Sequence, residues 1–217
     1  MKMKTAKGVS FMKVVMINGS PHAKGCTDRA LREMEAVFEK EGIGVEYFHV
    51  GNKAVRGCVA CGKCRETGRC VFDNDPVNEI AAAFSEADGL VVGSPVYYAH
   101  ASGGLLACLD RLFHSAPFDK RMKVGAAVVS SRRAGSTSAF DDINKHFTIA
   151  GMPVASSTYW NEVHGFTAAD VEKDLEGLQT MRNLARNMAF LMKSIALGKE
   201  AFGLPETEKG AFTSFMD

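Results

Sequence analysis

The feature that most constrains the fold of this chain is the regular alternation of short apolar runs with longer amphipathic segments. The apolar runs predict β-strands at residues 13–18, 45–50, 89–98, 123–131 and 153–160. The segments between and after them carry helical spacing or helix-start signals, at residues 27–40, 75–87, 103–115, 140–151 and 168–196. Strands that alternate with helices indicate a parallel sheet, because each parallel pair needs a crossover and the crossover helices cover both faces.

The length and composition fit one domain. The chain has 217 residues, of which 46% are hydrophobic, and this is enough apolar material for one full core. We expect the domain to occupy residues 13–200, with a cysteine loop at residues 57–72. The flanking residues 1–12 and 201–217 are expected to form tails.

The charges of the chain are balanced, with 26 basic and 25 acidic side chains and no basic stripe. This pattern argues against nucleic acid or a membrane surface as a partner. No apolar run reaches the length of about eighteen residues typical of a membrane-spanning helix, and the first residues lack the apolar core of a secretion signal. We therefore expect a cytoplasmic protein, where clustered cysteines favour metal or redox chemistry over structural disulfides.

In an open parallel sheet, a ligand binds outside the carboxyl ends of the strands, where the winding reverses. After the first predicted strand the sequence reads GSPHAKGCT, with hydroxyl groups at Ser20 and Thr27 and basic side chains at His22 and Lys24. A helix that starts near Thr27 suits a phosphate monoester, although Gly, Ser and Pro also mark ordinary turns. The spacing matches neither a nucleoside-triphosphatase loop nor a dinucleotide-binding turn.

The segments after the third and fourth predicted strands carry further candidates. After the third strand come apolar and aromatic side chains beside free backbone groups, namely Pro95, Val96, Tyr97 and Tyr98. A planar heterocycle needs such flat faces and backbone polar groups; alternatively, the two tyrosines cap the core. After the fourth strand, SSRRAGS supplies hydroxyl groups, Gly135 and two arginines, Arg132 and Arg133, which either neutralise a phosphate or are solvated surface charges.

Four cysteines lie close together in the sequence CVACGKCRETGRC. They are spaced C-x2-C-x2-C-x5-C, at Cys58, Cys61, Cys64 and Cys70. Three cysteines at intervals of three can bind three corners of a cubane cluster, and a fourth nearby can bind the last corner. A tetrahedral zinc site more often uses two separated C-x2-C pairs, and free or redox-active thiols are a third interpretation. Cys108, by contrast, lies on the apolar face of a predicted helix, so we expect it in the core.

Three motifs together resemble the flavodoxin-like NADPH-dependent FMN reductase family: GSPHAKGCT, SPVYYAHASGGLLACLDR and SSRRAGS, in this order and at these strand ends. The resemblance covers roughly residues 13–160. It implies a doubly wound five-stranded parallel sheet of order 2-1-3-4-5 with helices on both faces and FMN at the strand ends. It also implies NAD(P)H as electron donor and a homodimer or homotetramer.

The resemblance implies roles for individual residues. The phosphate-loop positions are Ser20, His22, Cys26 and Thr27. The positions along the isoalloxazine edge are Pro95, Val96, Tyr97 and Tyr98, and those of the third contact loop are Ser131 and Gly135. Two positions depart from the family pattern, since His22 stands where relatives often have arginine or lysine, and Cys26 where they often have asparagine.

The cysteine loop resembles that of the iron–sulfur flavoproteins, a branch of the same flavin fold that carries a [4Fe–4S] cluster next to FMN. This resemblance implies four cluster ligands: Cys58, Cys61, Cys64 and Cys70. Three basic residues of the loop, Lys63, Arg65 and Arg69, would offset the negative charge of such a cluster.

The leading hypothesis is an FMN-dependent oxidoreductase that takes electrons from NAD(P)H or, through a cluster, from a ferredoxin-like donor. Because the flavin carries the chemistry, no catalytic side-chain triad is expected. One alternative is a non-catalytic electron carrier that relays electrons between FMN, a [4Fe–4S] cluster and partner proteins. The other is a zinc-stabilised interaction module without flavin, which predicts a colourless protein.

Overall fold

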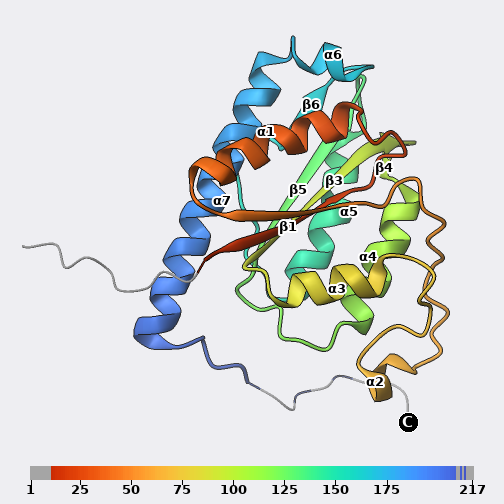
Figure 1. Cartoon of the computed structure of the whole chain (residues 1–217), viewed down its shortest axis with the longest axis vertical. Coiled ribbons are helices and arrows are strands. Elements are labelled where there is room, and N and C mark those ends of the chain that lie inside the picture. Colours follow the sequence, from red (N-terminus) through yellow and green to blue (C-terminus); the bar gives the residue numbers. More distant parts are fainter. Residues whose placement is uncertain (1–10, 209–210, 212, 214–217) are drawn as a thin grey trace, which may run out of the picture.

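The computed structural model describes residues 11–208, 211 and 213, and places a central sheet between two layers of helices (Figure 1). The strands are β1 (Lys13–Asn18), β2 (Gly44–His49), β3 (Gly89–Tyr97), β4 (His100–Ala101), β5 (Val124–Ser131) and β6 (Glu162–His164). Parallel pairing gives the order β2-β1-β3-β5-β6, and the short β4 pairs antiparallel with β3. Counting only the parallel strands, this is the 2-1-3-4-5 order, so the predicted sheet is confirmed.

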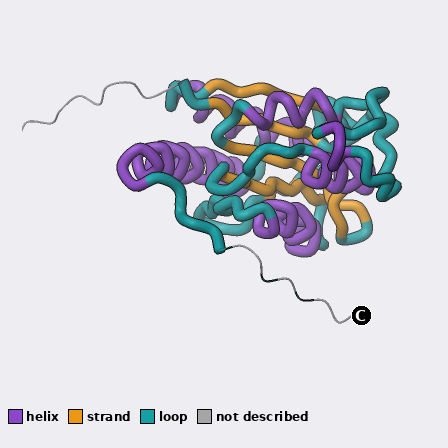
Figure 2. The backbone as a smooth tube through the Cα atoms, turned by 90° about the horizontal axis from the view of Figure 1, so that it is seen from below, coloured by secondary structure: helices purple, strands orange, loops and turns teal. Residues whose placement is uncertain are grey.

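Helices cover both faces of the sheet, as the alternation predicts. They are α1 (Cys26–Lys40), α2 (Cys64–Thr67), α3 (Val77–Ser85), α4 (Gly103–Ser115), α5 (Ser136–Ile149), α6 (Ala168–Val171) and α7 (Leu175–Phe202). One face packs against α1 and α7, and the other against α3, α4 and α5 (Figure 1). Figure 2 shows α7 nearly end-on beside the strands.

Alternating side chains of β1 divide the core into these two layers. Val14 and Met16 pack with α1 and α7, whereas Val15 and Ile17 pack with α3, α4 and α5; all four are fully buried. Burial of each such side chain stabilises the fold by about 1.5–3 kcal/mol. Both core layers therefore fix β1, whose carboxyl end opens the first candidate loop.

The predicted fifth strand at residues 153–160 is wrong, because the edge strand is β6, slightly later in the chain. Only the start of the apolar run pairs with β5, through hydrogen bonds of Gly125 with Pro153 and Ala155. The chain then bends, since the Ser157 hydroxyl bonds to the Tyr159 carbonyl (2.7 Å) within its own turn. Serine side chains commonly compete with sheet pairing in this way.

The predicted single helix at residues 168–196 is two helices, α6 and α7. Asp174 divides them because its carboxylate accepts a hydrogen bond from the Gly177 amide (2.9 Å) and so caps α7. α7 continues to Phe202, so it crosses the expected boundary between domain and tail at residue 200.

Two other helices begin at positions that differ from the prediction. α3 begins at Val77 with Pro76 at its N-cap; the carboxylate of Asp75 before it accepts a hydrogen bond from the Val77 amide (3.2 Å) and pairs with Arg111 of α4. α5 begins at Ser136, earlier than predicted. Among the described residues, no helix has both the length and the apolar character needed to cross a membrane.

Candidate functional site

The register of the sheet brings three loops to one edge. β1 and β3 pair at Asn18 and Gly93, and β3 and β5 pair at Pro95 and Ser130. The carboxyl ends of β1, β3 and β5 are therefore adjacent, and the segments that follow them form one site. This is the edge at which open α/β sheets bind ligands.

The loop between β1 and α1 is held by its own hydrogen bonds. The Ser20 amide donates to Asn18 Oδ1 (2.9 Å), and the buried Ser20 hydroxyl accepts from the His22 amide (3.2 Å). The loop ends at Gly25, the N-cap of α1, which receives no side-chain cap. An uncapped helix start presents backbone N–H groups and the positive end of the helix dipole, which together favour an anion.

Two of the predicted phosphate-loop side chains bond within the protein. Thr27 is 1% exposed, and its hydroxyl lies 2.8 Å from that of Ser130 at the end of β5. Cys26 donates to the carbonyl of Gly165 (3.5 Å), and its burial raises the pKa of this thiol, so it stays neutral. His22 is exposed beside them. Thr27 and Cys26 thus join α1 to the neighbouring strand ends.

The segment after β3 is a tight hairpin with β4. Tyr98 and Ala99 form its tip, with φ angles of +49° and +62°. Two successive positive φ angles are the geometry of a type I′ turn, which is unusual without glycine or asparagine. Tyr97 is 46% exposed and Tyr98 is fully exposed, so the tyrosines do not cap the core. Pro95 and Val96 are half-buried at the base of the hairpin.

Two contacts hold this hairpin in place. Asp142 of α5 accepts hydrogen bonds from the Ala101 amide (3.3 Å) and from His100 Nδ1 (3.2 Å). Burial raises the pKa of the Asp142 carboxyl, but these hydrogen bonds together with the bond and charge of Lys145 lower it more, so the pKa lies below its ordinary value. Gly135 has a φ of +87°, and a Cβ there would lie 2.8 Å from the Cα of Ala99. The third loop therefore packs directly against the hairpin tip.

The third loop is also bonded to β6. The Ser131 hydroxyl lies 3.2 Å from His164 Nδ1, and the Gly165 amide donates to the Ser131 carbonyl (3.1 Å). Ser131 is buried, whereas the neighbouring Arg132 and Arg133 are exposed. The two arginines are therefore exposed at the rim of the site.

Aromatic side chains are exposed after the fifth apolar run. Trp160 is 52% exposed, and its ring meets that of Tyr159 edge-on with centroids 5.0 Å apart. Phe166 is 80% exposed. The adjacent Asn161 is buried, so the chain turns its amide inward and its aromatic rings outward.

The second candidate site is the cysteine loop, whose four thiols line one small cavity. Cys58 and Cys61 are exposed, and Cys64 and Cys70 are half-buried; all four are free thiols. The cavity measures about 20 Å³, which holds about one water molecule. In the part of the chain that the structure describes, no three His, Cys, Asp or Glu side chains are gathered as metal ligands. The thiols share a cavity without forming a closed cage.

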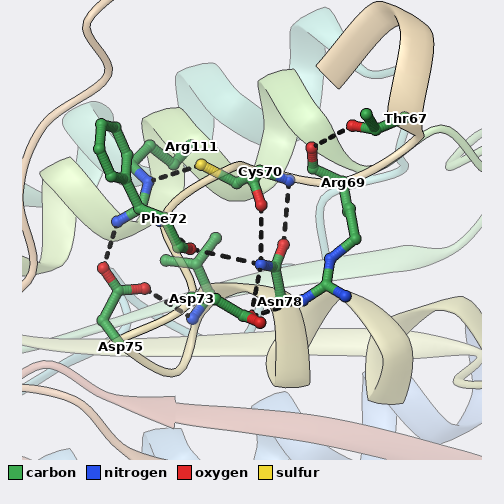
Figure 3. Close-up of polar contacts among 9 residues, drawn as sticks. Thr67, Arg69, Cys70, Phe72, Asp73, Asp75, Asn78 and Arg111 are labelled. Atoms are coloured by element: carbon green, nitrogen blue, oxygen red, sulfur yellow. Dashed lines mark hydrogen bonds and ion pairs between the residues drawn. The ribbon is translucent and has the colours of Figure 1, made fainter. Parts of the chain in front are cut away.

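The two halves of the cysteine loop are ordered to different degrees. In the second half, Asn78 of α3 accepts from the Cys70 amide (3.0 Å) and donates to the carbonyls of Cys70 (3.0 Å) and Phe72 (3.3 Å), as Figure 3 shows. In the first half, Ala60 has a φ of +51°, and its amide donates to Cys58 Sγ (3.4 Å). Among the described residues, no backbone N–H of residues 56–61 donates to a backbone carbonyl.

Arg111 of α4 completes the wall of the cavity. Its side chain is 1% exposed, pairs with Asp75 and donates from Nε to Cys70 Sγ (3.2 Å) (Figure 3). Burial lowers the pKa of this guanidinium, but its hydrogen bonds raise it more, so it stays charged. Four thiols, two N–H···S contacts and a buried cation suit an anionic iron–sulfur cluster, and the loosely held first half can adjust to one.

The sequence did not reveal two of these residues in advance. Asp142 and Arg111 lie in helical segments, where a charge is usually solvated. For Arg111, one feature of the sequence could have indicated burial. It lies three residues after Cys108 and next to Leu112, within an apolar stripe. Cys108 itself is fully buried, as expected, and burial raises the pKa of its thiol to about 12.

Comparison with known proteins gives a consistent result. The family model described as NADPH-dependent FMN reductase matches residues 12–167. An iron–sulfur flavoprotein of Methanocaldococcus jannaschii is 35% identical over 195 residues, which cover 85% of this chain and 99% of the relative. An iron–sulfur flavoprotein of Methanosarcina thermophila is 30% identical over 193 residues, which cover 87% and 100%.

Solved structures share the fold. An archaeal flavodoxin superposes with a TM-score of 0.57 at 17% identity, over 84% of this chain and 99% of the flavodoxin. RosB superposes with a TM-score of 0.68 at 14% identity, over 95% and 98%. At such identities the likeness shows the fold alone, which is flavodoxin-like α/β.

Proposed function

The chain belongs to the NADPH-dependent FMN reductase family, and from this premise we propose that it is an FMN-dependent oxidoreductase that also carries a [4Fe–4S] cluster in its cysteine loop. The observation that carries the proposal is the single cavity lined by four free thiols and walled by the buried Arg111. Relatives named iron–sulfur flavoproteins, at 30–35% identity over nearly their full length, support it.

The residues at the strand ends would hold FMN. The uncapped start of α1 and the loop from Ser20 to Thr27 would bind the phosphate, with His22 and Cys26 beside it. The hairpin segment 95–98 would lie along the isoalloxazine edge, and Ser131 and Gly135 would line its other side. The four cysteines would bind the cluster. When bound, flavin and cluster supply hydride and single-electron transfer; the chain binds and orients them.

The first test is the cofactor content of protein purified without oxygen. We expect about four iron and about four sulfide per FMN, which is the composition of one [4Fe–4S] cluster for each flavin. The measurements are iron and sulfide assays together with the absorbance of released FMN. FMN without iron would leave a simple flavin reductase with free thiols, whereas zinc without FMN would indicate the interaction module.

A non-catalytic electron carrier is the second candidate. Exposure of Cys58 and Cys61 favours it, because a cluster at these thiols would be accessible to a protein partner. Stopped-flow spectra separate the two candidates. Rapid bleaching of the flavin by NADPH or NADH alone indicates the reductase. Reduction by a ferredoxin-like protein, with neither nucleotide active, indicates the carrier.

We further propose that the chain forms a homodimer or homotetramer through the flavin end. The support is the exposure of Tyr98, Trp160 and Phe166 near this edge, since exposed aromatic groups are enriched in interfaces. Light scattering after size-exclusion chromatography measures the assembly. A monomer at micromolar concentration would contradict this part of the proposal.

A further inference from the structure

Arg111 lies where the two ends of the cysteine loop meet. Its Nη1 donates to the carbonyl of Arg56 (3.3 Å), just before the first cysteine, and its Nη2 donates to the carbonyl of Phe72 (3.0 Å), just after the last. Its Nε donates to Cys70 Sγ (3.2 Å). One guanidinium thus contacts both ends of the loop and one of its four sulfur atoms.

The burial of this side chain needs a reason other than packing. Asp75, which pairs with Arg111, is also 1% exposed. A buried ion pair adds little net stability, because the cost of desolvation offsets the attraction. Arg111 directs its hydrogen bonds at the loop and at Asp75, which precedes α3. The planar fork of arginine can make all these bonds together, and no other side chain offers as many donors.

A second observation points to a ligand in the same cavity. Ser115 follows Arg111 by one turn of α4 and lines the cavity beside it. The residue is 4% exposed, and its hydroxyl oxygen has no hydrogen-bond partner among the described residues. A buried polar atom without a partner is rare in folded proteins. The wall formed by α4 therefore carries the guanidinium of Arg111, which donates to Cys70 Sγ, and the hydroxyl of Ser115, which has no partner among the described residues.

The contrast between the two halves of the loop then has a physical meaning. Cys70 is fixed through its backbone by Asn78 and through its sulfur by Arg111. Cys58 and Cys61 are exposed, and among the described residues no backbone N–H of residues 56–61 donates to a backbone carbonyl; Cys58 Sγ accepts only a local bond from the Ala60 amide (3.4 Å). The second half of the loop therefore holds its sulfur through partners on two helices, whereas the first half has no such support.

We propose that Arg111 is a positioning residue that closes the cysteine loop and presents Cys70 as the preformed ligand around which the metal centre assembles. Cys58 and Cys61 then close over the centre from the solvent side. The identity of the centre rests on the proposed function, but the closing of the loop is a property of the metal-free chain.

The test compares thiol reactivity in reduced, metal-free protein. The variants are Arg111→Gln, Arg111→Lys and a matched control, Arg186→Gln, which removes the same charge from an exposed position of α7, outside the loop. Iodoacetamide labelling of each cysteine is followed by mass spectrometry. The rates are compared at high pH, where every thiol is ionised, so that the effect of the Arg111 charge on thiol ionisation does not enter. There, in the unaltered chain, we expect Cys70 to react about tenfold more slowly than Cys58, because Cys70 is half-buried and its bond to Arg111 must open first.

Each variant has a distinct expected result. Arg111→Gln brings the Cys70 rate to within about threefold of the Cys58 rate, Arg111→Lys restores part of the difference, and Arg186→Gln changes neither rate. In iron-loaded protein, Arg111→Gln lowers the iron content and shifts the cluster potential to a more negative value, because an N–H···S bond stabilises the more negative, reduced cluster. FMN content and thermal midpoint show whether each variant is folded.

Two results would overturn the inference. One is equal labelling of Cys70 and Cys58 in the unaltered chain, which can be measured whether or not the variants fold. The other is an unchanged Cys70 rate in Arg111→Gln. Slow Cys70 labelling in a protein that never binds iron supports the positioning role and rejects only the cluster.

Discussion

The strand-end site and the cysteine loop are built in opposite ways. At the strand ends, sheet register and short bonds such as Thr27 to Ser130 fix the loops before any ligand arrives. In the cysteine loop, no strand and only the short α2 order the chain, and side chains of α3 and α4 hold one end of it. The sheet thus fixes the first site, whereas the first half of the cysteine loop is loosely held, and on our proposal it completes its structure when the metal centre binds.

This difference implies that the two sites can be disrupted separately. Damage to a cysteine should remove the metal centre and leave the strand-end site intact, because the sheet does not depend on the loop. Damage to the hairpin contacts should weaken flavin binding and leave the metal content unchanged. The following predictions test this separation, in order of decreasing effect.

The largest effect is expected for Cys64→Ser. A cubane cluster needs its four protein ligands, so we expect the iron content to fall by more than about tenfold while FMN content is unchanged. Iron assay and flavin absorbance of anaerobically purified protein measure both. The control is Cys108→Ala, which removes a thiol from the core and should keep the iron. Parallel loss of FMN in Cys64→Ser would show that the sites are not independent.

Gly135→Val should have the reverse effect. The φ of +87° disfavours any side chain, and a Cβ would lie 2.8 Å from the Cα of Ala99, so the hairpin tip must move. Strain of this kind costs about 1–3 kcal/mol, and we expect FMN affinity to fall about 10- to 100-fold. Quenching of flavin fluorescence measures the affinity.

The control for Gly135 is Gly103→Ala, since no atom lies within 4 Å of a Cβ at Gly103. This variant should bind FMN normally. Unchanged affinity in Gly135→Val would mean that the flavin does not contact this loop, and loss of iron would mean that the hairpin and the cysteine loop are coupled.

A smaller effect is expected for Asp142→Asn, which weakens the bonds to Ala101 and His100. We expect a loss of about 1 kcal/mol in unfolding free energy at pH 7 and a severalfold loss of FMN affinity. The control is the exposed neighbour, Asp141→Asn. A variant that unfolds and binds FMN like the unaltered chain would show that the hairpin needs no support from α5.

The effect of Asp142 should depend on pH in a defined direction. The pKa of this carboxyl is lower in the folded chain than its ordinary value of about 3.9. Its contribution to stability is therefore complete above that ordinary value and is lost as the pH falls through the lower, folded-state pKa. Urea unfolding at pH 7 and at pH 3 measures the difference between the variant and the unaltered chain, which should shrink at the lower pH.

Much of the fold could be predicted from the sequence, because it depends on the periodicity of the apolar residues and on the turn residues that separate the periodic segments. The apolar runs placed β1, β3 and β5 and so located the strand-end site. The fifth strand was misplaced because the bonds of Ser157 within its own turn are not visible in an apolar run.

The two candidate sites differ in how much of each could be predicted from the sequence. Strand ends meet by topology, so residues far apart in the chain could be assigned to one place. The cysteine spacing predicts a candidate donor set but not its geometry, because Arg111 and Asn78, which order Cys70, lie on helices outside the loop. Local spacing carries no information about such partners.

The smallest effect concerns Thr27, whose hydroxyl either braces the site or contacts the phosphate. In the structure it lies 2.8 Å from the Ser130 hydroxyl, with the residue 1% exposed. Bracing predicts that Thr27→Val costs about 1 kcal/mol of stability and changes FMN affinity less than about fivefold. Ser130→Ala should have the same effect, and the double variant should add little, because both changes remove one bond. A loss of FMN affinity beyond about tenfold in Thr27→Val alone would assign the hydroxyl to the phosphate, and the first loop would then rearrange around its ligand as we propose for the cysteine loop.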